Sequence, residues 1–349
     1  MITQNSTNEI GTLTIETLIT VLSIDDQFVA NIESKISPLA IALFLKNTND
    51  PLVNSIVCDL LKKLITNPYT NMKIEQRLMP TLTSIISNSL ANKLENQSVM
   101  DQRDFSSLLT STLDLITTTV RSTTQIPLSD ITMNAFIHVI NLCLKSDDTA
   151  VLQSGGECLR AYISKSIDQI VNWKDDKGVS ALNYIVLVIN HMLDPKTSEN
   201  GCSFIGKLIN TLIKQTANIL GDNLDAILKS VLSKMQSSNI LLVQQSLIMV
   251  FAHLIHNKLD AVLTFLSNLP GPTGQPVLEF LMTEWVAKQN SFVGTYESKI
   301  SILALAKLLE HAIGTEDQRF QNIFVKGDRI INPIEGIKTR SKSKDGIFF

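Results

Sequence analysis

Apolar residues recur at helical spacing along residues 241–289, where the pattern is clearest. One stripe repeats at steps of four, three and four, the spacing of a single helix face. It consists of Val243, Leu247, Val250 and Leu254. A second stripe follows at once and consists of Leu259, Val262, Leu263 and Leu266. The segment therefore predicts two consecutive apolar helices.

A segment rich in proline and glycine, residues 270–276, then interrupts the helical pattern. Proline lacks a backbone N–H donor and glycine has no preference for the helix, so both residue types end helices. A further stripe follows the interruption: Leu278, Leu281, Met282 and Trp285. A helix, a short break and an antiparallel helix cannot bury their apolar stripes alone. We therefore expect repeated copies of this unit to stack on one another.

The same alternation of helix and break predicts elements along the rest of the chain. Two starts carry a capping residue followed by a proline in the first turn, Ser37 with Pro38 and Asp50 with Pro51. Asn67 is expected to end a helix, and a polar linker is expected over 91–104. Predicted helical segments include 11–46 (a pair), 74–90, 128–145, 179–193, 203–220, 224–235 and 300–313.

The predicted fold class is all-α, a HEAT/armadillo-type α-solenoid, which is a superhelical array of antiparallel helix pairs. About seven pairs over 11–313 give a period of about 43 residues, inside the ~40–47 residues of HEAT and armadillo repeats. We expect residues 1–10 to be a disordered N-terminus and 314–349 an irregular loop or tail. No long apolar/polar alternation predicts a strand.

Charge excludes some partner classes. The formal net charge is −3 with a sequence pI near 6.0, so no basic field extends over the chain to attract nucleic acid or an anionic membrane. We expect no direct nucleic-acid binding. The longest apolar windows are shorter than the ~20 residues of a spanning helix, and the N-terminus lacks a signal peptide pattern. No membrane insertion is expected.

The residue types that serve as nucleophiles, bases or metal ligands form no catalytic pattern in this sequence. Cys58, Cys143, Cys158 and Cys202 form no CxxC pair, which predicts buried thiols in a reducing compartment. His253 and His256 lack the glutamate of an HExxH zinc site. No nucleophile elbow or phosphate loop is present in the sequence. We expect neither an enzyme nor a cofactor.

Several longer runs of sequence resemble one family of nuclear transport receptors, the importin-beta (karyopherin-beta) family. The runs are KSDDTAVLQSGGECLRAYIS at 145–164, LDPKTSE at 193–199, NLDAILKSVLSKMQ at 223–236, QSLIMVFAHLIH at 245–256, SNLPGPTGQPVLEFLMTEW at 267–285 and EGIKTRSKSK at 335–344. The chain is similar to middle and later HEAT repeats of such receptors. It lacks a match to the first repeats, which bind Ran-GTP in this family.

The resemblance implies nuclear import of basic protein cargo, such as core histones and ribosomal proteins, under the control of Ran. It also implies contact with nuclear pore proteins and shuttling between cytoplasm and nucleus. Because the first repeats are missing, we expect weak Ran-GTP binding. The helical pattern alone leaves an alternative open, a HEAT-repeat scaffold that holds a multiprotein complex together without transporting it.

Candidate contacts to cargo or other partners are charged residues near predicted helix ends and in the tail. The acidic candidates are Asp147, Asp148, Asp175, Asp176, Glu279 and Glu284, and the basic ones are Lys338, Arg340, Lys342 and Lys344. The alternative for each is a helix cap, a solvated face or a solvated tail. Trp173 and Trp285 are expected in the core, although either could be an exposed anchor. Gly155 and Gly156, inside a predicted helix, indicate a close helix approach or a kink.

Overall fold

A computed structural model describes residues 8–47, 50–92, 99–272, 274–321 and 323. The described residues form thirteen α-helices and three short 3₁₀-helices. Their only β-type pairs are two isolated bridges, Lys174 with Ser180 and Pro270 with Pro276. The all-α prediction is therefore confirmed.

The chain divides into two compact units, Met1–Val250 and Phe251–Phe349. The first unit contains ten whole helices and the beginning of an eleventh. Their bounds are α1 Asn8–Leu22, α2 Asp26–Lys46, α3 Pro51–Thr66, α4 Asn71–Asn92, α5 Val99–Ser122, α6 Asp130–Lys145, α7 Thr149–Asn172, α8 Ala181–Leu193, η1 Glu199–Cys202, α9 Ile205–Leu220, α10 Asp222–Ser237 and α11 Leu241–Asn268.

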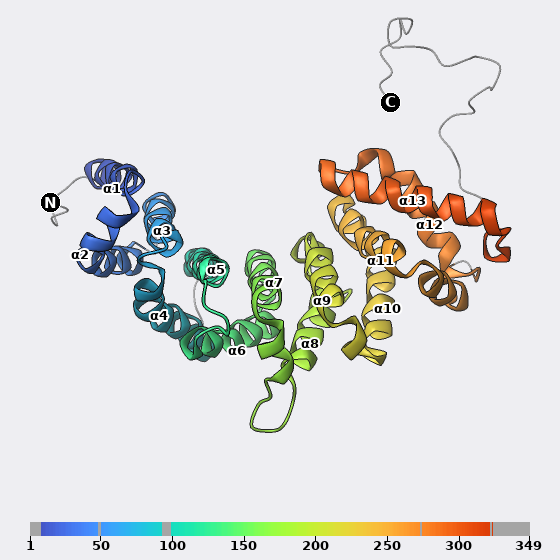
Figure 1. The fold of residues 1–349 in the computed structure, drawn as a ribbon, viewed down its shortest axis with the longest axis horizontal. Helices are drawn as coiled ribbons and strands as arrows, with labels where there is room; N and C mark the ends of the chain where they lie inside the picture. Colours follow the sequence, from blue (N-terminus) through green and yellow to red (C-terminus); the bar gives the residue numbers. More distant parts are fainter. Residues whose placement is uncertain (1–7, 48–49, 93–98, 273, 322, 324–349) are drawn as a thin grey trace, which may run out of the picture. The chain divides into compact units, whose positions relative to one another are not determined.

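The helices of the first unit form two layers (Figure 1). In one layer α1, α3, α5, α7 and α9 contact one another in order, and in the other α4, α6, α8 and α10 do the same. Successive helices such as α2 and α3, or α6 and α7, join the layers. Apolar side chains, mainly leucine, isoleucine and valine, fill the space between them. This is the stacked arrangement of antiparallel pairs that the apolar stripes predict.

Three polar bonds between neighbouring repeats span nearly the same separation in sequence. Asn67 donates to the Asp26 carbonyl across 41 residues, Gln169 to the Leu128 carbonyl across 41, and Lys234 to the Asp194 carbonyl across 40. Each bond ties one pair of helices to the next, so the separation reports the length of the repeat. It agrees with the predicted period of about 43 residues.

Several predicted helix ends are confirmed by their capping bonds. The Asp50 carboxylate accepts from the Val53 N–H at 3.1 Å with Pro51 in the first turn, and Asn67 is the C-cap of α3. Ser129 caps α6, and Asp148 caps α7 by accepting from two backbone N–H groups. Such caps satisfy donors that the first turn leaves unpaired, which makes them readable from local sequence.

The predicted start at Ser37 and Pro38 is wrong, because α2 runs through both residues from Asp26 to Lys46. Its apolar face stays buried on either side of the proline. The Ser37 hydroxyl serves a tertiary contact instead. It donates to the Glu33 carboxylate at 2.7 Å and accepts from Arg77 of α4 at 2.6 Å. The Ser-Pro pair that resembles a helix start therefore belongs to a buried polar cluster between repeats.

Two further boundaries differ from prediction. The expected polar linker over 91–104 is partly helical, since α4 extends to Asn92 and α5 begins at Val99. The two apolar helices expected at 241–268 form one helix, α11, that kinks at Lys258, where φ is −144° and ψ is 50°. The stripes on either side of the kink are those of the sequence, but the chain bends between them without a loop.

Gly155 marks a close helix approach and not a kink. A Cβ at this position would lie 2.3 Å from the Cys143 Sγ of α6. The kink in α7 lies farther along, at Ser166. The four cysteines are free and buried, as predicted, and burial raises the pKa of the Cys58 thiol to about 11. The reducing compartment remains a prediction.

The second unit contains the end of α11 followed by α12 (Val277–Lys288), η2 (Gln289–Ser291), α13 (Thr295–Thr315) and η3 (Gln318–Phe320). The predicted Pro/Gly break is confirmed, since the Val277 N–H closes a loop onto the Leu269 carbonyl at 2.9 Å. Trp285 is buried, as expected, and its indole donates to the Ser301 hydroxyl at 2.6 Å. Helix α13 continues to Thr315, past residue 314 where the tail was expected to begin, and residues 324–349 lie outside the described part, so the tail stays a prediction.

Two helices, α2 and α11, are long and apolar enough to cross a membrane by length and composition alone. Of the apolar window in α11, 56% is buried inside the protein, and core helices commonly pass the same test. These two apolar helices are longer than the apolar runs that the sequence pattern indicated. The absence of membrane insertion stays a prediction.

Candidate functional site

Charged side chains connect α3, α5 and α7 across the odd-numbered layer of the first unit. Lys62 of α3 forms an ion pair with Asp114 of α5 at 2.5 Å. Arg121, near the end of α5, pairs with Glu157 of α7. The Lys165 ammonium of α7 donates to the Arg121 carbonyl at 3.2 Å. These contacts place a row of partly exposed charges over three neighbouring helices.

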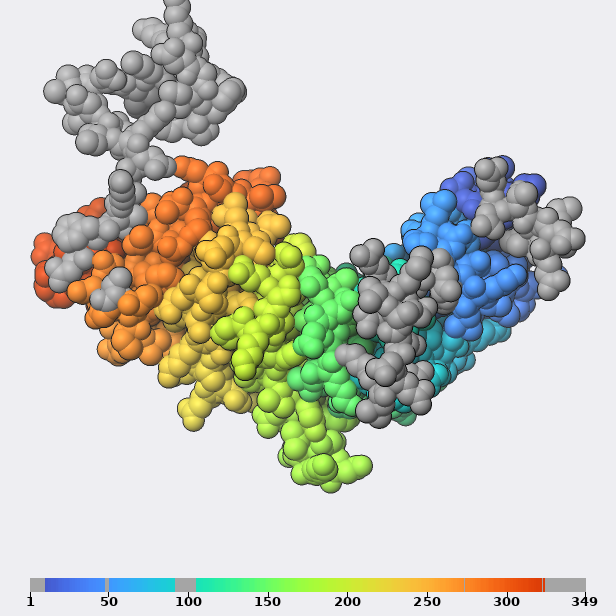
Figure 2. All heavy atoms as spheres, turned by 180° about the vertical axis from the view of Figure 1, so that it is seen from behind, coloured from blue at the N-terminus to red at the C-terminus, as the bar shows by residue number. Residues whose placement is uncertain are grey.

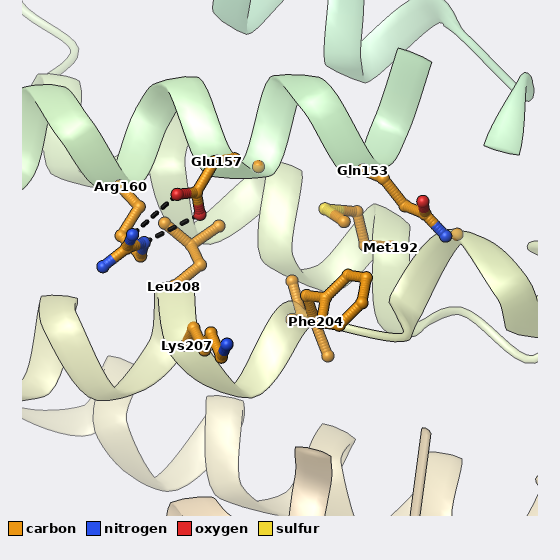
Figure 3. A pocket seen from close by; sticks show the side chains of 10 residues that line it. Gln153, Glu157, Arg160, Met192, Phe204, Lys207 and Leu208 are labelled. Carbon is orange, nitrogen blue, oxygen red and sulfur yellow. Dashed lines mark hydrogen bonds and ion pairs between the residues drawn. The ribbon is translucent and has the colours of Figure 1, made fainter. Parts of the chain in front are cut away.

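Glu157 is the central member of this row. Its carboxylate accepts from Nε and Nη2 of Arg160, at 2.8 and 2.6 Å (Figure 3). It also accepts from Arg121. Burial alone would raise the pKa of Glu157, but the bonds from Arg160 and Arg121 outweigh it and hold the pKa below its ordinary value. Glu157 therefore stays ionised and holds two arginines on one face.

A cavity of about 210 Å³ lies beside Glu157, between α7, α8 and the start of α9. Figure 3 shows Gln153, Glu157 and Arg160 on one side and Phe204, Lys207 and Leu208 on the other. A shallower groove of about 420 Å³ continues from it toward α5 and shares Gln153, Glu157 and Phe204. Together they form one continuous depression, called here the α7–α9 cleft.

The segment between α8 and α9, which forms one wall of the cleft, is held by buried polar groups. Lys234 of α10 is only 1% exposed, and its ammonium donates to the Asp194 and Thr197 carbonyls at 2.9 and 3.0 Å. The Glu199 carboxylate accepts from the Ser238 hydroxyl at 2.7 Å and from the Asn239 N–H at 3.0 Å. These bonds fix the backbone that leads to Phe204.

A loop at residues 173–180 projects from the first unit and is seen in both directions of view (Figures 1 and 2). Asp175 organises it by accepting from the Lys177 and Val179 N–H groups and from the Tyr184 hydroxyl at 2.6 Å. The Tyr184 bond in particular lowers the pKa of Asp175. The loop therefore has a defined shape and leaves the neighbouring Asp176 exposed.

Comparison with known proteins now identifies the class of molecule. A family profile described as Importin-11-like, TPR repeats, matches residues 55–348. The chain belongs to the importin-beta family. It is 38% identical over 315 residues to Importin-9 of Drosophila melanogaster, and this match covers 90% of the chain and 30% of that protein. It is also 25% identical over 348 residues to Importin subunit beta-5 of Schizosaccharomyces pombe, covering 97% of the chain and 32% of that protein.

These matches confirm the importin resemblance, including that to importin nine among the members of the family. The chain spans about a third of the length of these two relatives. Importin-beta receptors are not enzymes, in agreement with the sequence prediction. The matching family is described by TPR repeats, which are ~34 residues long. The bonds from Asn67, Gln169 and Lys234 to the preceding repeat span 40 or 41 residues, which fits the longer HEAT unit better.

The acidic candidates in this importin chain lie in three separate places. Asp147 and Asp148 precede α7, while Asp175 and Asp176 follow it, so the two pairs lie at opposite ends of one helix. Asp148 and Asp175 both use their carboxylates within the protein, as a cap and as a loop organiser. Asp147 and Asp176 are exposed.

The remaining candidates belong to the second unit or lie outside the described residues. Glu279 is half-buried in the first turn of α12, and Glu284 forms an ion pair with Lys288 one turn later. The four basic candidates, Lys338, Arg340, Lys342 and Lys344, fall outside the described part of the chain. A role in partner binding stays a prediction for all of them.

Metal ligation finds no support in the described residues, which contain no group of three or more His, Cys, Asp or Glu placed to hold an ion. His256 instead contacts the Ile300 carbonyl at 3.1 Å, and His253 lies against the Tyr296 ring. Trp173 is half-buried, with its ring edge to face against Phe136 and Tyr184.

The α7–α9 cleft was not predicted from the sequence. Its residues come from α5, α7, α8 and α9 and are ordinary members of helical stripes, with no motif of their own. The one sequence signal for the cleft is Phe204. This large apolar residue stands at the start of α9, and its side chain is exposed instead of packing in the core.

Proposed function

We propose that this chain is a cargo-holding part of a nuclear import receptor that carries basic proteins, such as core histones and ribosomal proteins, from cytoplasm to nucleus. The observation that supports it is the match to the importin family over residues 55–348. The stacked helices add a physical means. A layered array offers a long surface on which many individually weak contacts can act together.

Basic cargo would be held by exposed carboxylates at helix ends. Asp147 and Asp176 have this position, and both lie in polar loops that a partner can reach. Each exposed ion pair contributes only ~0–1 kcal/mol, so several repeats would have to contribute at once. Such binding weakens as salt screens the charges, with a Debye length of ~10 Å at 0.1 M. A strong dependence of affinity on salt is therefore part of the proposal.

In the complete receptor we propose that Ran-GTP releases the cargo and that nuclear pore proteins are met during passage. The receptor would then shuttle between cytoplasm and nucleus. Small rotations between neighbouring repeats can add up along an array and so couple Ran binding to cargo release. This chain by itself is expected to bind Ran-GTP weakly.

A titration of the chain with a core histone dimer, at low and at physiological salt and with or without Ran-GTP, tests the proposal. Binding at low salt that weakens as salt rises would support it. A double variant, Asp147→Asn with Asp176→Asn, should bind less tightly than Glu16→Gln with Asp225→Asn, which removes the same charge elsewhere on the first unit. No binding at low salt would refute the proposal for basic cargo, and tight Ran-GTP binding would contradict the expectation for Ran.

Nuclear accumulation of the histone dimer in permeabilised cells, driven by the complete receptor, separates transport from scaffolding. A complex that forms but stays in the cytoplasm would favour the non-transport scaffold. Accumulation that requires Ran-GTP would favour the import receptor.

A further inference from the structure

The α7–α9 cleft combines an apolar interior with an exposed aromatic residue at its edge. Met192 and Leu208 are buried beneath it, and Gly156 and Gly201 add no side chains to fill it. The ring of Phe204, by contrast, is 52% exposed. Single exposed apolar residues are common on protein surfaces, but an aromatic ring at the edge of an apolar cavity can contact a side chain that enters the cavity.

Cations outnumber carboxylates around the cavity of the cleft, and Asp114, the further carboxylate that borders the adjoining groove, is paired with Lys62 at 2.5 Å. Arg160 and Lys207 border it directly, and Arg121 lies next to it through its ion pair with Glu157. Glu157 is the single carboxylate of the cavity, and both arginines already bind it. The bonds to Arg160 occupy Nε and Nη2, which leaves Nη1 as a donor. Lys207 lies 5.6 Å from the centre of the Phe204 ring.

The surplus of positive charge makes the cleft unsuited to a basic segment. A carboxylate placed beside Arg160 and Lys207 would gain charge-assisted hydrogen bonds, which are the stronger kind. An apolar side chain on the same segment would cover Phe204 and enter the cavity. The charge and the apolar interior thus point to the same ligand chemistry.

We propose that the α7–α9 cleft docks a polypeptide segment in which a large apolar side chain stands next to an acidic residue. A polypeptide is favoured over a small molecule because the cavity opens into the groove across α5. Thr110, Ser111 and Ser154 border this groove with partly exposed side chains, whose hydroxyl oxygens can accept from a passing backbone. The site is distinct from the acidic helix ends proposed for basic cargo, and it does not depend on that proposal.

The test uses fluorescein-labelled dodecapeptides of glycine and serine that carry a central Glu-Leu-Glu. Two matched peptides replace the leucine by alanine or both glutamates by glutamine, and a third carries Lys-Leu-Lys. Fluorescence anisotropy with the intact chain should give the tightest binding for Glu-Leu-Glu. Loss of either feature should weaken binding about tenfold, the factor that corresponds to ~1.4 kcal/mol.

Three variants assign the binding to the cleft. Phe204→Ala and Arg160→Gln should each weaken binding of the Glu-Leu-Glu peptide about tenfold. The control is Phe28→Ala, which removes another exposed aromatic side chain, on α2, and should leave this binding unchanged. Circular dichroism of each variant checks that the helices are retained. Equal affinity for all four peptides, preference for Lys-Leu-Lys, or equal binding by Phe204→Ala and Phe28→Ala would overturn the proposal.

The histone titration keeps the two proposals separate. If Phe204→Ala weakens binding of the acidic peptide but leaves binding of the histone dimer unchanged, the cleft and the cargo contacts are different sites, as proposed. If it weakens both equally, the cleft is also a cargo site and the proposed separation of the two sites is wrong.

Discussion

Lys234 is a buried charged residue that holds one wall of the α7–α9 cleft in place. Its ammonium satisfies two backbone carbonyls of the segment between α8 and α9 and has almost no exposure to water. Methionine has a similar length and would fill the same space without donating a hydrogen bond. The change therefore removes one donor from each carbonyl, and the Asp194 carbonyl still accepts from the Thr197 N–H at 3.0 Å.

Lys234→Met should lower the free energy of unfolding by about 1–3 kcal/mol, because unsatisfied buried acceptors carry that penalty. Lys229→Met, at an exposed position of the same helix, should change it by less than about 0.5 kcal/mol. Urea denaturation followed by circular dichroism measures both. Equal losses in the two variants would show that the buried bonds are not needed for stability.

Glu157 makes stability depend on pH in a defined direction. Burial would raise its pKa, but the bonds from Arg160 and Arg121 prevail, so the pKa in the folded protein lies below the ordinary 4.5. A carboxylate whose pKa is lower in the folded state contributes stability above the unfolded-state pKa. This contribution is lost as the pH falls below 4.5 and through the folded-state value.

Glu157→Gln should therefore lower the free energy of unfolding at pH 7, and this loss should become progressively smaller below pH 4.5. The side chain is 38% exposed, so solvent screening limits the expected difference at pH 7 to about 0.5–1 kcal/mol. Urea denaturation of both proteins at pH 7, 5 and 4 gives the comparison. A difference that stays constant across this range would mean that the carboxylate charge contributes nothing.

At the level of elements, α9 and α11 approach each other at a single glycine. A Cβ at Gly206 would lie 1.9 Å from the Ser246 carbonyl oxygen, which is backbone and cannot rotate away. The Gly206 N–H also donates to the Ser246 hydroxyl at 3.0 Å. Any side chain here would force the two helices apart.

Gly206→Ala should destabilise the protein by about 1–3 kcal/mol or more, the usual cost of overpacking a close contact. Gly11→Ala is the matched control, because it also lies in a helix and its Cβ would meet nothing within 4 Å. That change should stabilise by about 0.4–1 kcal/mol through the lower entropy of the unfolded chain. Thermal denaturation of both variants measures the two signs. Stabilisation by Gly206→Ala would mean that α9 and α11 can separate at little cost.

At the scale of the whole chain, each repeat of the first unit contacts mainly its neighbours. The odd-numbered helices contact the next odd-numbered helix, and the polar bonds between repeats span close to one period. In such an array, stability is approximately a sum of repeat terms and nearest-neighbour terms. A local defect should therefore remain local.

Gly206→Ala should accelerate amide hydrogen exchange in α8 to α11 by tenfold or more, roughly the factor for 1.4 kcal/mol, and leave α3 and α4 nearly unchanged. Hydrogen exchange with mass spectrometry resolves these segments by peptide. Faster exchange spread evenly from α1 to α10 would show instead that the first unit opens as one cooperative block.

Much of this architecture could be predicted because it depends on short-range chemistry. Apolar stripes at helical spacing reported the helices, and Asp50 and Asp148 reported the starts of two of them, since a cap acts within one turn. The same local rule failed at Ser37 and Pro38, where partners from other helices decide the role of the hydroxyl. The importin resemblance was likewise present in runs of sequence that need no structure to be compared.

The sequence by itself therefore determined the helices, their repeat and the family, because periodicity, caps and similarity all lie within one stretch of chain. Only the tertiary structure decided which polar groups meet across repeats, where Gly206 lets two helices touch, and that Arg160, Glu157 and Phe204 surround one cleft. These residues lie on different helices, and their meeting depends on how side chains pack in three dimensions. No periodic pattern along the chain records that packing.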